Sequence, residues 1–235
     1  MVLQLNLEKM DVLISELLEH KDEDYFFENN LIEIQRLKAI GVPYIEIKKI
    51  AKKYKRNTAL ITELKQSNYY EAKLLYYFLS KNISVTEKDI DAQFEFLEND
   101  FIIDKFLNYL VFPSGYCEIK LQNWIDSKIV LEQKLAYLLI SEMAKSEKFT
   151  NFNFEFYLDK IKDNILYAEN EVKIAMNQAI ISIGIHSDKL HGKTLQMAKA
   201  IGKLRCVRTK LILKCNDAFT LLNSAKTRAK FTVEF

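Results

Sequence analysis

The sequence contains very little of the two residues that most often interrupt regular structure, with 5 glycines and 2 prolines among 235 residues. A chain with so few residues suited to tight turns is poorly suited to the many short strands and hairpins of an all-β protein. Long helices joined by short loops need fewer such residues. The composition therefore favours an all-α fold, and the chain is long enough to bury a substantial core.

The sequence also has few cysteines, little net charge and no long apolar run. Three widely spaced cysteines without a C-x-x-C pair argue against a disulfide framework or a zinc site and are typical of a reducing cytoplasm. No apolar run approaches the ~18 residues of a membrane span, and no signal-peptide pattern is present. We therefore expect a cytoplasmic protein without membrane contacts. The formal net charge is only +2, so affinity for nucleic acid would have to come from local clusters of Lys and Arg.

Apolar residues recur at helical spacing along almost the whole chain. The predicted helices span residues 3–19, 24–40, 43–56, 58–66, 69–80, 86–97, 101–112, 117–126, 130–144, 151–166, 169–185 and 187–202. Helix pairs recur about every 30–40 residues, which is typical of stacked helical repeats. We expect one repeat domain over residues 1–235, with a plain helical bundle as the alternative. The basic, β-branched segment after residue 203 is expected to be irregular.

Two helix boundaries carry specific signals. Gly41 is suited to a left-handed cap at the end of the second helix, and Pro43 then opens the next one. The helix near residue 86 has two candidate N-caps. Ser84 and Glu87 have the spacing of a capping box, and Thr86 is the alternative.

Five stretches, in order, resemble the DNA alkylation repair proteins, which are AlkD-like HEAT-repeat DNA glycosylases. They are GVPYIEIKKIAKKY (41–54), YYEAKLL (69–75), VTEKDID (85–91), EVKIAMNQAIISIG (171–184), and GKL (202–204) with KCNDA (214–218). The resemblance implies a HEAT-like solenoid, a curved α-α superhelix whose concave face binds duplex DNA. Members of this family remove N3- or N7-alkylated purines, and no cofactor is expected.

The motif positions of that family show how far this chain has diverged. An alkylated purine already carries positive charge and leaves as a neutral base, so the site must chiefly stabilise a cationic sugar with a carboxylate and aromatic rings. Of the family's key groups, the resemblance retains one acid, Asp104, as the candidate catalytic residue. The other positions hold Asp100 and Gln178 (for Trp), Phe101 (for the first acid), Ile181 (for Arg) and Gln133, or Lys134 with a one-residue shift (for the groove Arg).

The resemblance therefore implies a protein related to alkylpurine DNA glycosylases that binds, as a monomer, the DNA backbone or an unusual DNA structure, with little or no base excision. One alternative is an active glycosylase that uses Asp104 and the lability of the lesion alone. Another is a protein-interaction scaffold that does not bind DNA.

Local clusters of cations supply the expected DNA contacts. On the helix from Pro43, one row holds Lys48, Lys52 and Lys55, and the next holds Lys49, Lys53 and Arg56. Such a row can meet a phosphate backbone, although a solvated helix face has the same pattern. The candidate DNA-binding residues are Lys48, Lys49, Lys52, Lys53, Arg56, Gln133, Lys134, Gln178, Arg205 and Arg208.

Other polar and aromatic residues are interpreted more simply. On the helix from about residue 101, the polar row Asp100, Asp104 and Asn108 is predicted to be separate from the apolar stripe, so Asp104 is predicted to be exposed. Trp124 is predicted to be a packing residue. The three histidines lack ligand spacing to Cys or carboxylates, so no metal site is expected.

Overall fold

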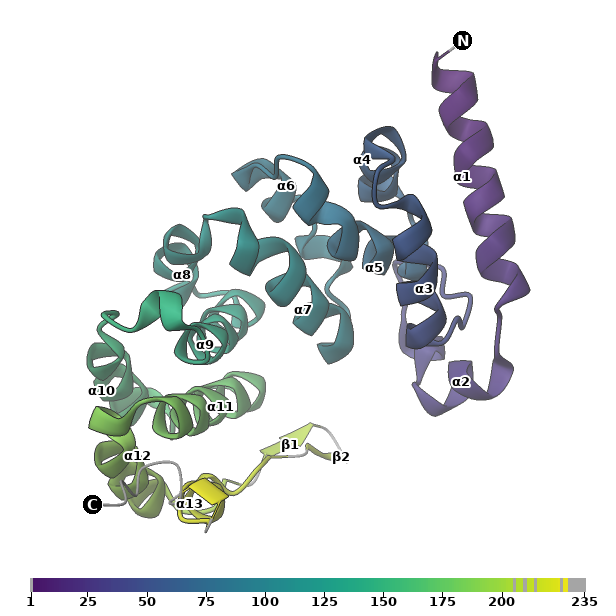
Figure 1. Ribbon diagram of the computed structural model, residues 1–235. Coiled ribbons are helices and arrows are strands. Elements are labelled where there is room, and N and C mark those ends of the chain that lie inside the picture. Colours follow the sequence, from purple (N-terminus) through teal and green to yellow (C-terminus); the bar gives the residue numbers. More distant parts are fainter. Residues whose placement is uncertain (1, 205, 209–210, 214, 225, 228–235) are drawn as a thin grey trace. The chain divides into compact units, whose positions relative to one another are not determined.

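The computed structural model describes residues 2–204, 206–208, 211–213, 215–224 and 226–227, most of them in helices (Figure 1). The chain forms two compact units, Met1–Tyr116 and Cys117–Phe235. The predicted all-α fold of HEAT-like helical repeats is confirmed within each unit. That the two units form a single domain remains a prediction.

The first unit is built around a fully buried helix. Every residue of α5, Tyr70–Leu79, is buried. The helices α3, α4 and α7 pack against it, and α1 packs against α4. The helices of this unit are α1 (Val2–Glu19), α2 (Glu23–Glu28), α3 (Tyr44–Tyr54), α4 (Thr58–Gln66), α5, α6 (Glu87–Asp91) and α7 (Asp100–Phe106). A π-helical turn, Leu107–Val111, continues α7, and 3-10 turns cover Leu31–Glu33, Ser80–Asn82, Phe94–Phe96 and Phe112–Ser114.

Side-chain caps explain where several of these helices begin. The side chains of Asn57 and Asn99 accept hydrogen bonds from backbone amides in the first turns of α4 and α7. At α6 the cap is Thr86 and not Ser84, because Thr86 and Asp89 form a complete capping box. These contacts are local, and the corresponding starts lie within a residue or so of the predicted ones.

The predicted helix over residues 24–40 is wrong. α2 ends at Glu28, and Asn30 has a left-handed backbone with φ of 51°. Beyond the 3-10 turn the chain is irregular, because two distant carboxylates take the place of helical hydrogen bonds. Glu98 accepts from the amides of residues 35 and 36, and the buried Glu71 accepts from those of residues 40, 41 and 42 at 2.8–3.3 Å.

Gly41 lies at the centre of this irregular segment. Its φ is +94°, and a Cβ atom added there would lie 2.9 Å from Phe26 Cβ. The glycine therefore has the left-handed backbone that its identity predicts, but it leads into α3 instead of ending a long helix.

The second unit is a stack of paired helices closed by a short hairpin. The helix α11 lies beside α9 and also packs against α12 and α13 (Figure 1). Its elements are α8 (Cys117–Ile125), α9 (Val130–Ala144), α10 (Phe154–Asn164), α11 (Asn170–His186), α12 (Asp188–Ile201), β1 (Cys206–Arg208), β2 (Leu211–Leu213) and α13 (Ala218–Leu222). The antiparallel pairing of β1 and β2, with Cys206 opposite Leu213, corrects the expectation of an irregular segment.

Side chains of α11 fix its neighbours. Ser182 is hydrogen-bonded to Ser141 of α9 at 2.7 Å. The Asn177 amide donates to the carbonyl of Asn216 at 2.8 Å, which holds the segment before α13. Trp124 is 3% exposed, as expected of a packing residue. Within the described ranges, no helix is both long enough and apolar enough to cross a membrane.

Candidate nucleic-acid interface

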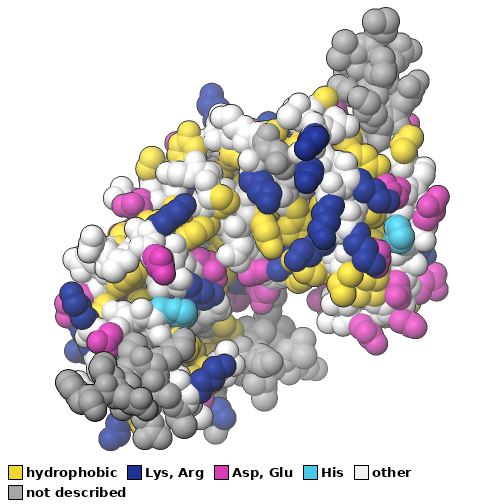
Figure 2. All heavy atoms as spheres, viewed as in Figure 1, with side chains coloured by type: hydrophobic (Ala, Val, Ile, Leu, Met, Phe, Trp, Pro, Cys, Tyr) yellow, Lys and Arg dark blue, Asp and Glu magenta, His cyan; other side chains and the backbone are white. Residues whose placement is uncertain are grey.

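The helix α3 presents a cationic face to solvent. Its other face buries Ile47, Ile50 and Ala51 against the first unit. Lys and Arg side chains gather over the part of the molecule where α3 lies (Figure 2). The exposed cations of α3 and of the two residues that follow it are Lys48, Lys49, Lys52, Lys53, Lys55 and Arg56.

These six cations differ in how far they are neutralised. Lys49 forms an ion pair with Glu46 at 2.7 Å, and Lys53 forms one with Glu16 of α1. In the part of the chain that the structure describes, the other four have no carboxylate at ion-pair distance, and they are Lys48, Lys52, Lys55 and Arg56. These four therefore carry most of the positive field of the α3 face.

The candidate catalytic residue, Asp104, is already engaged. Its side chain is 48% exposed, as the sequence pattern predicts. One carboxylate oxygen lies 2.5 Å from Lys105 Nζ, and the other accepts a hydrogen bond from Asn108 Nδ2 at 2.9 Å. The negative charge at the retained motif position is thus balanced by the neighbouring lysine.

An aromatic cluster surrounds this ion pair. The Tyr44 ring lies edge-on to Phe101 with centroids 5.3 Å apart and is tilted against Phe78 at 5.6 Å. Phe78 in turn meets Tyr109 edge-on at 4.8 Å. Lys105 Nζ lies 5.0 Å from the centroid of the Tyr44 ring and 4.7 Å from that of Phe101.

Sequence reasoning missed this cluster because its rings come from α3, α5, α7 and the π turn. Each of these four elements contributes one ring, so the pattern of a single helix does not reveal the cluster. The one available signal is Phe101, an aromatic residue at a motif position that the family fills with an acid. Aromatic residues are thus present beside Asp104. They do not lie at the two motif positions where the family has Trp, because Asp100 and Gln178 occupy those positions.

The protonation of the cluster follows from its contacts. Burial lowers the pKa of Lys105, but the hydrogen bond and the charge of Asp104 outweigh this effect and raise the pKa above its usual value. Burial and a hydrogen bond with Tyr44 raise the pKa of Tyr109. At neutral pH the cluster therefore holds a charged Lys105 ammonium near a protonated Tyr109.

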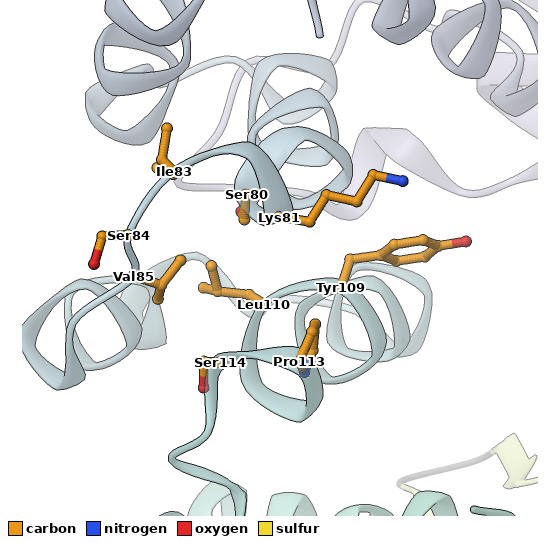
Figure 3. A pocket seen from close by; sticks show the side chains of 9 residues that line it. All are labelled: Ser80, Lys81, Ile83, Ser84, Val85, Tyr109, Leu110, Pro113 and Ser114. Atoms are coloured by element: carbon orange, nitrogen blue, oxygen red, sulfur yellow. The ribbon is translucent and has the colours of Figure 1, made fainter. Parts of the chain in front are cut away.

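A pocket of about 270 Å³ lies beside Tyr109. The side chains of Lys81 and Tyr109 extend in the same direction from the two sides of this pocket (Figure 3). The rest of its lining is hydroxyl and apolar, from Ser80, Ile83, Ser84, Val85, Leu110, Pro113 and Ser114. The exposed Lys81 adds one more cation to this unit.

The predicted residues of the second unit are partly used internally. Gln133 on α9 donates a hydrogen bond to the carbonyl of Ser127, and Lys134 pairs with Glu171 of α11 at 3.4 Å. Gln178 is exposed on α11. Arg205 lies outside the described residues, and for Arg208 the structure describes only its place in β1. No group of three or more potential metal ligands is found among the residues described.

Comparison with known proteins defines the class to which this fold belongs. A profile of the family described as DNA alkylation repair enzyme matches residues 13–204. The chain therefore belongs to this family, and the resemblance seen in its motifs is confirmed.

Its relatives include two uncharacterized Listeria proteins. The protein from Listeria innocua serovar 6a is 26% identical over 193 residues, which cover 80% of this chain and 84% of the relative. The protein from Listeria monocytogenes serovar 1/2a is 26% identical over 195 residues, covering 81% and 84%.

A solved structure shares the fold. It is described as a new family of proteins related to the HEAT-like repeat DNA glycosylases with affinity for branched DNA structures. It matches with a TM-score of 0.80 at 21% identity, covering 94% of this chain and 95% of that one. At this identity the likeness shows the fold alone.

Proposed function

We propose that this protein binds DNA through phosphate contacts of the α3 face, with branched DNA as the preferred substrate class, and that it does not excise bases. The observation that carries the proposal is a set of four exposed cations on and just after α3 that have no carboxylate partner among the described residues, in a chain whose net charge is only +2. In a nearly neutral protein, a concentrated cationic face such as this one provides a defined place for a polyanion.

The geometry of the row suits a nucleic-acid backbone. Lys48, Lys52 and Lys55 follow at helical spacing, so they span about 10 Å along α3 at ~1.5 Å per residue. Duplex DNA presents roughly six charges over that length. Each phosphate that the protein neutralises releases counterions, and four contacts give a slope of about −3.6 in a plot of log affinity against log salt.

Membership in the DNA alkylation repair family and the description of the structural neighbour support DNA, and branched DNA in particular, as the ligand class. At a branch point the phosphates of several strands converge, which raises the local density of negative charge. A compact group of cations such as the α3 face therefore gains more electrostatic binding free energy at a branch point than on an isolated duplex.

The surroundings of Asp104 support the absence of excision. A carboxylate that stabilises a developing sugar cation has to direct its charge at the substrate. In this chain that charge is directed at Lys105. Asp100 and Gln178 stand at the two Trp positions and cannot supply ring faces.

The binding part of the proposal is tested by neutralising unpartnered cations. We expect the triple variant Lys52→Gln, Lys55→Gln, Arg56→Gln to bind DNA at least about tenfold more weakly at low salt, with a slope smaller by about 3. The matched control neutralises three exposed lysines of the second unit, Lys148, Lys162 and Lys199. It should stay within about twofold of the parent, and an equal loss in this control would attribute binding to net charge and refute the role of α3.

Substrate class and excision are measured in parallel. The parent is titrated against a four-way junction and against a duplex built from the same strands, and we expect tighter binding to the junction. The same preparation is incubated with DNA that contains N7-methylguanine. Release of the base above the spontaneous rate, in proportion to protein concentration, would contradict the non-excising proposal.

A further inference from the structure

Lys105 occupies a site with the composition of an organic-cation receptor. The rings of Tyr44 and Phe101 and the carboxylate of Asp104 surround its ammonium group, and we name these three groups the Lys105 cage. The nitrogen lies 5.0 Å and 4.7 Å from the two ring centroids and 2.5 Å from the carboxylate. Only 15% of the Lys105 side chain is exposed.

Each wall of the cage favours a cation for its own reason. An aromatic face attracts a positive charge within about 6 Å through its ring quadrupole, and the attraction grows as water is excluded. The carboxylate adds a charge-assisted hydrogen bond. The edge-on contact of the Tyr44 and Phe101 rings, at 89°, sets two aromatic surfaces at right angles around one position.

We propose that Lys105 is a built-in occupant of this cage, and that it closes the protein to external organic cations, cationic bases among them. The Lys105 ammonium makes cation–π contacts with both rings and also neutralises Asp104. A positively charged ligand that approaches the cage therefore meets a bound cation in place of an electron-rich cavity. Lys105 is on this view a specificity-determining residue, and the proposal does not depend on whether the protein binds DNA.

The geometry has a direct consequence for a variant without the ammonium. Truncation of Lys105 to alanine leaves the two rings and an unneutralised carboxylate around a vacated position. Alanine is compatible with the helix α7. The resulting site has the chemistry that accepts a small quaternary ammonium ion. In the parent, the Lys105 ammonium already occupies this position and neutralises the carboxylate.

The test uses tetramethylammonium chloride as the probe, without DNA, followed by NMR of the tyrosine rings. In Lys105→Ala, we expect the chemical shifts of the tyrosine rings to change saturably at millimolar concentrations of tetramethylammonium. The parent and Lys105→Arg, which keeps a cation in the cage, should give only the small linear drift that sodium chloride gives. In the double variant Lys105→Ala, Asp104→Asn the affinity should fall at least several-fold, because the carboxylate wall is lost. Saturable binding to the parent equal to that of Lys105→Ala would overturn the proposal, as would no binding to a folded Lys105→Ala.

A second measurement keeps the proposal testable on the unaltered protein. In acetylation followed by mass spectrometry, the caged Lys105 should react at least about tenfold more slowly than the exposed Lys52 of α3. Asp104→Asn should speed the reaction of Lys105 without changing that of Lys52. Equal rates for the two lysines in the parent would mean that the cage does not hold its ammonium. Failure of the DNA titration alone leaves both of these measurements standing.

Discussion

Replacing Glu71 by alanine should destabilise the first unit more than any other single loss of a carboxylate there. Glu71 is 0% exposed, and its oxygens accept hydrogen bonds from three consecutive buried amides, those of Ile40, Gly41 and Val42. Burial raises the pKa of this carboxyl group, and the amide hydrogen bonds oppose that rise. The same amides lie directly before α3, so Glu71 also holds the start of the cationic helix.

The expected magnitude follows from the groups left behind. Each buried amide without an acceptor costs roughly 1–3 kcal/mol. Water entering the vacated space would satisfy part of this requirement, so we expect a loss of about 3–5 kcal/mol for Glu71→Ala. This is a large fraction of the roughly 5–15 kcal/mol that stabilises a typical domain. Glu71→Gln retains one acceptor oxygen and should lose about 1–2 kcal/mol.

The assay is urea unfolding followed by circular dichroism. Glu98→Ala is the matched control, because Glu98 also accepts from loop amides, those of residues 35 and 36, but at an exposed site. We expect it to cost about 1 kcal/mol, since water replaces the lost acceptor. If Glu71→Ala costs no more than Glu98→Ala, the reasoning from buried amides is refuted.

Three further predictions concern single residues. Lys73 is buried with its ammonium 3.6 Å from the Phe96 ring centroid, and burial lowers its pKa to about 8 from 10.5. The unfolded chain therefore binds more protons between these values, so stability should rise with pH above 8, and urea unfolding of Lys73→Met should lack this rise. Gly41→Ala should cost at least about 2 kcal/mol in the same assay, because φ is positive and the added Cβ would clash with Phe26. Gly115 also has a positive φ but open space around it, so Gly115→Ala should cost less. An equal cost for the two variants would exclude the clash as the cause. Asp104→Asn should change stability by no more than about 0.5 kcal/mol, as expected at a position whose side chain is 48% exposed, and should leave DNA affinity equal or slightly higher; a loss of several kcal/mol would mean a structural role.

The helices that could be predicted from sequence are those whose limits are set locally. The predicted spans 58–66 and 130–144 match α4 and α9 residue for residue. For α4, the side chain of Asn57 caps the first turn, three residues from the amide that it accepts from. Local apolar periodicity and a local cap suffice in such cases.

The segment before α3 could not be predicted for the opposite reason. Its irregular backbone depends on Glu71 and Glu98, which lie about 30 and 60 residues further along the chain. Helical periodicity over residues 24–40 carries no information about these partners.

The candidate site divides in the same way. The row of cations on α3 and the pairing of Lys49 with Glu46 follow from helical spacing, but the ion pair that neutralises Lys53 does not, since Glu16 belongs to another helix. The cage around Lys105 needs two rings from different helices, so no single stretch of sequence reveals it. DNA binding by the residues named from sequence stays a prediction.

The π turn after α7 sets the direction in which Tyr109 points. A π turn closes its hydrogen bonds over one more residue than an α-helical turn does. One additional residue in a helix rotates every later side chain by about 100° relative to the earlier ones. Tyr109 lies within the turn, at Leu107–Val111, and its ring meets Phe78 at 4.8 Å. Deleting one residue from this turn would shift the phase of the helix and carry Tyr109 away from its neighbours. The phase of this one turn, and not the sequence of α3 or α5 alone, therefore decides whether the Tyr109 ring joins the cluster.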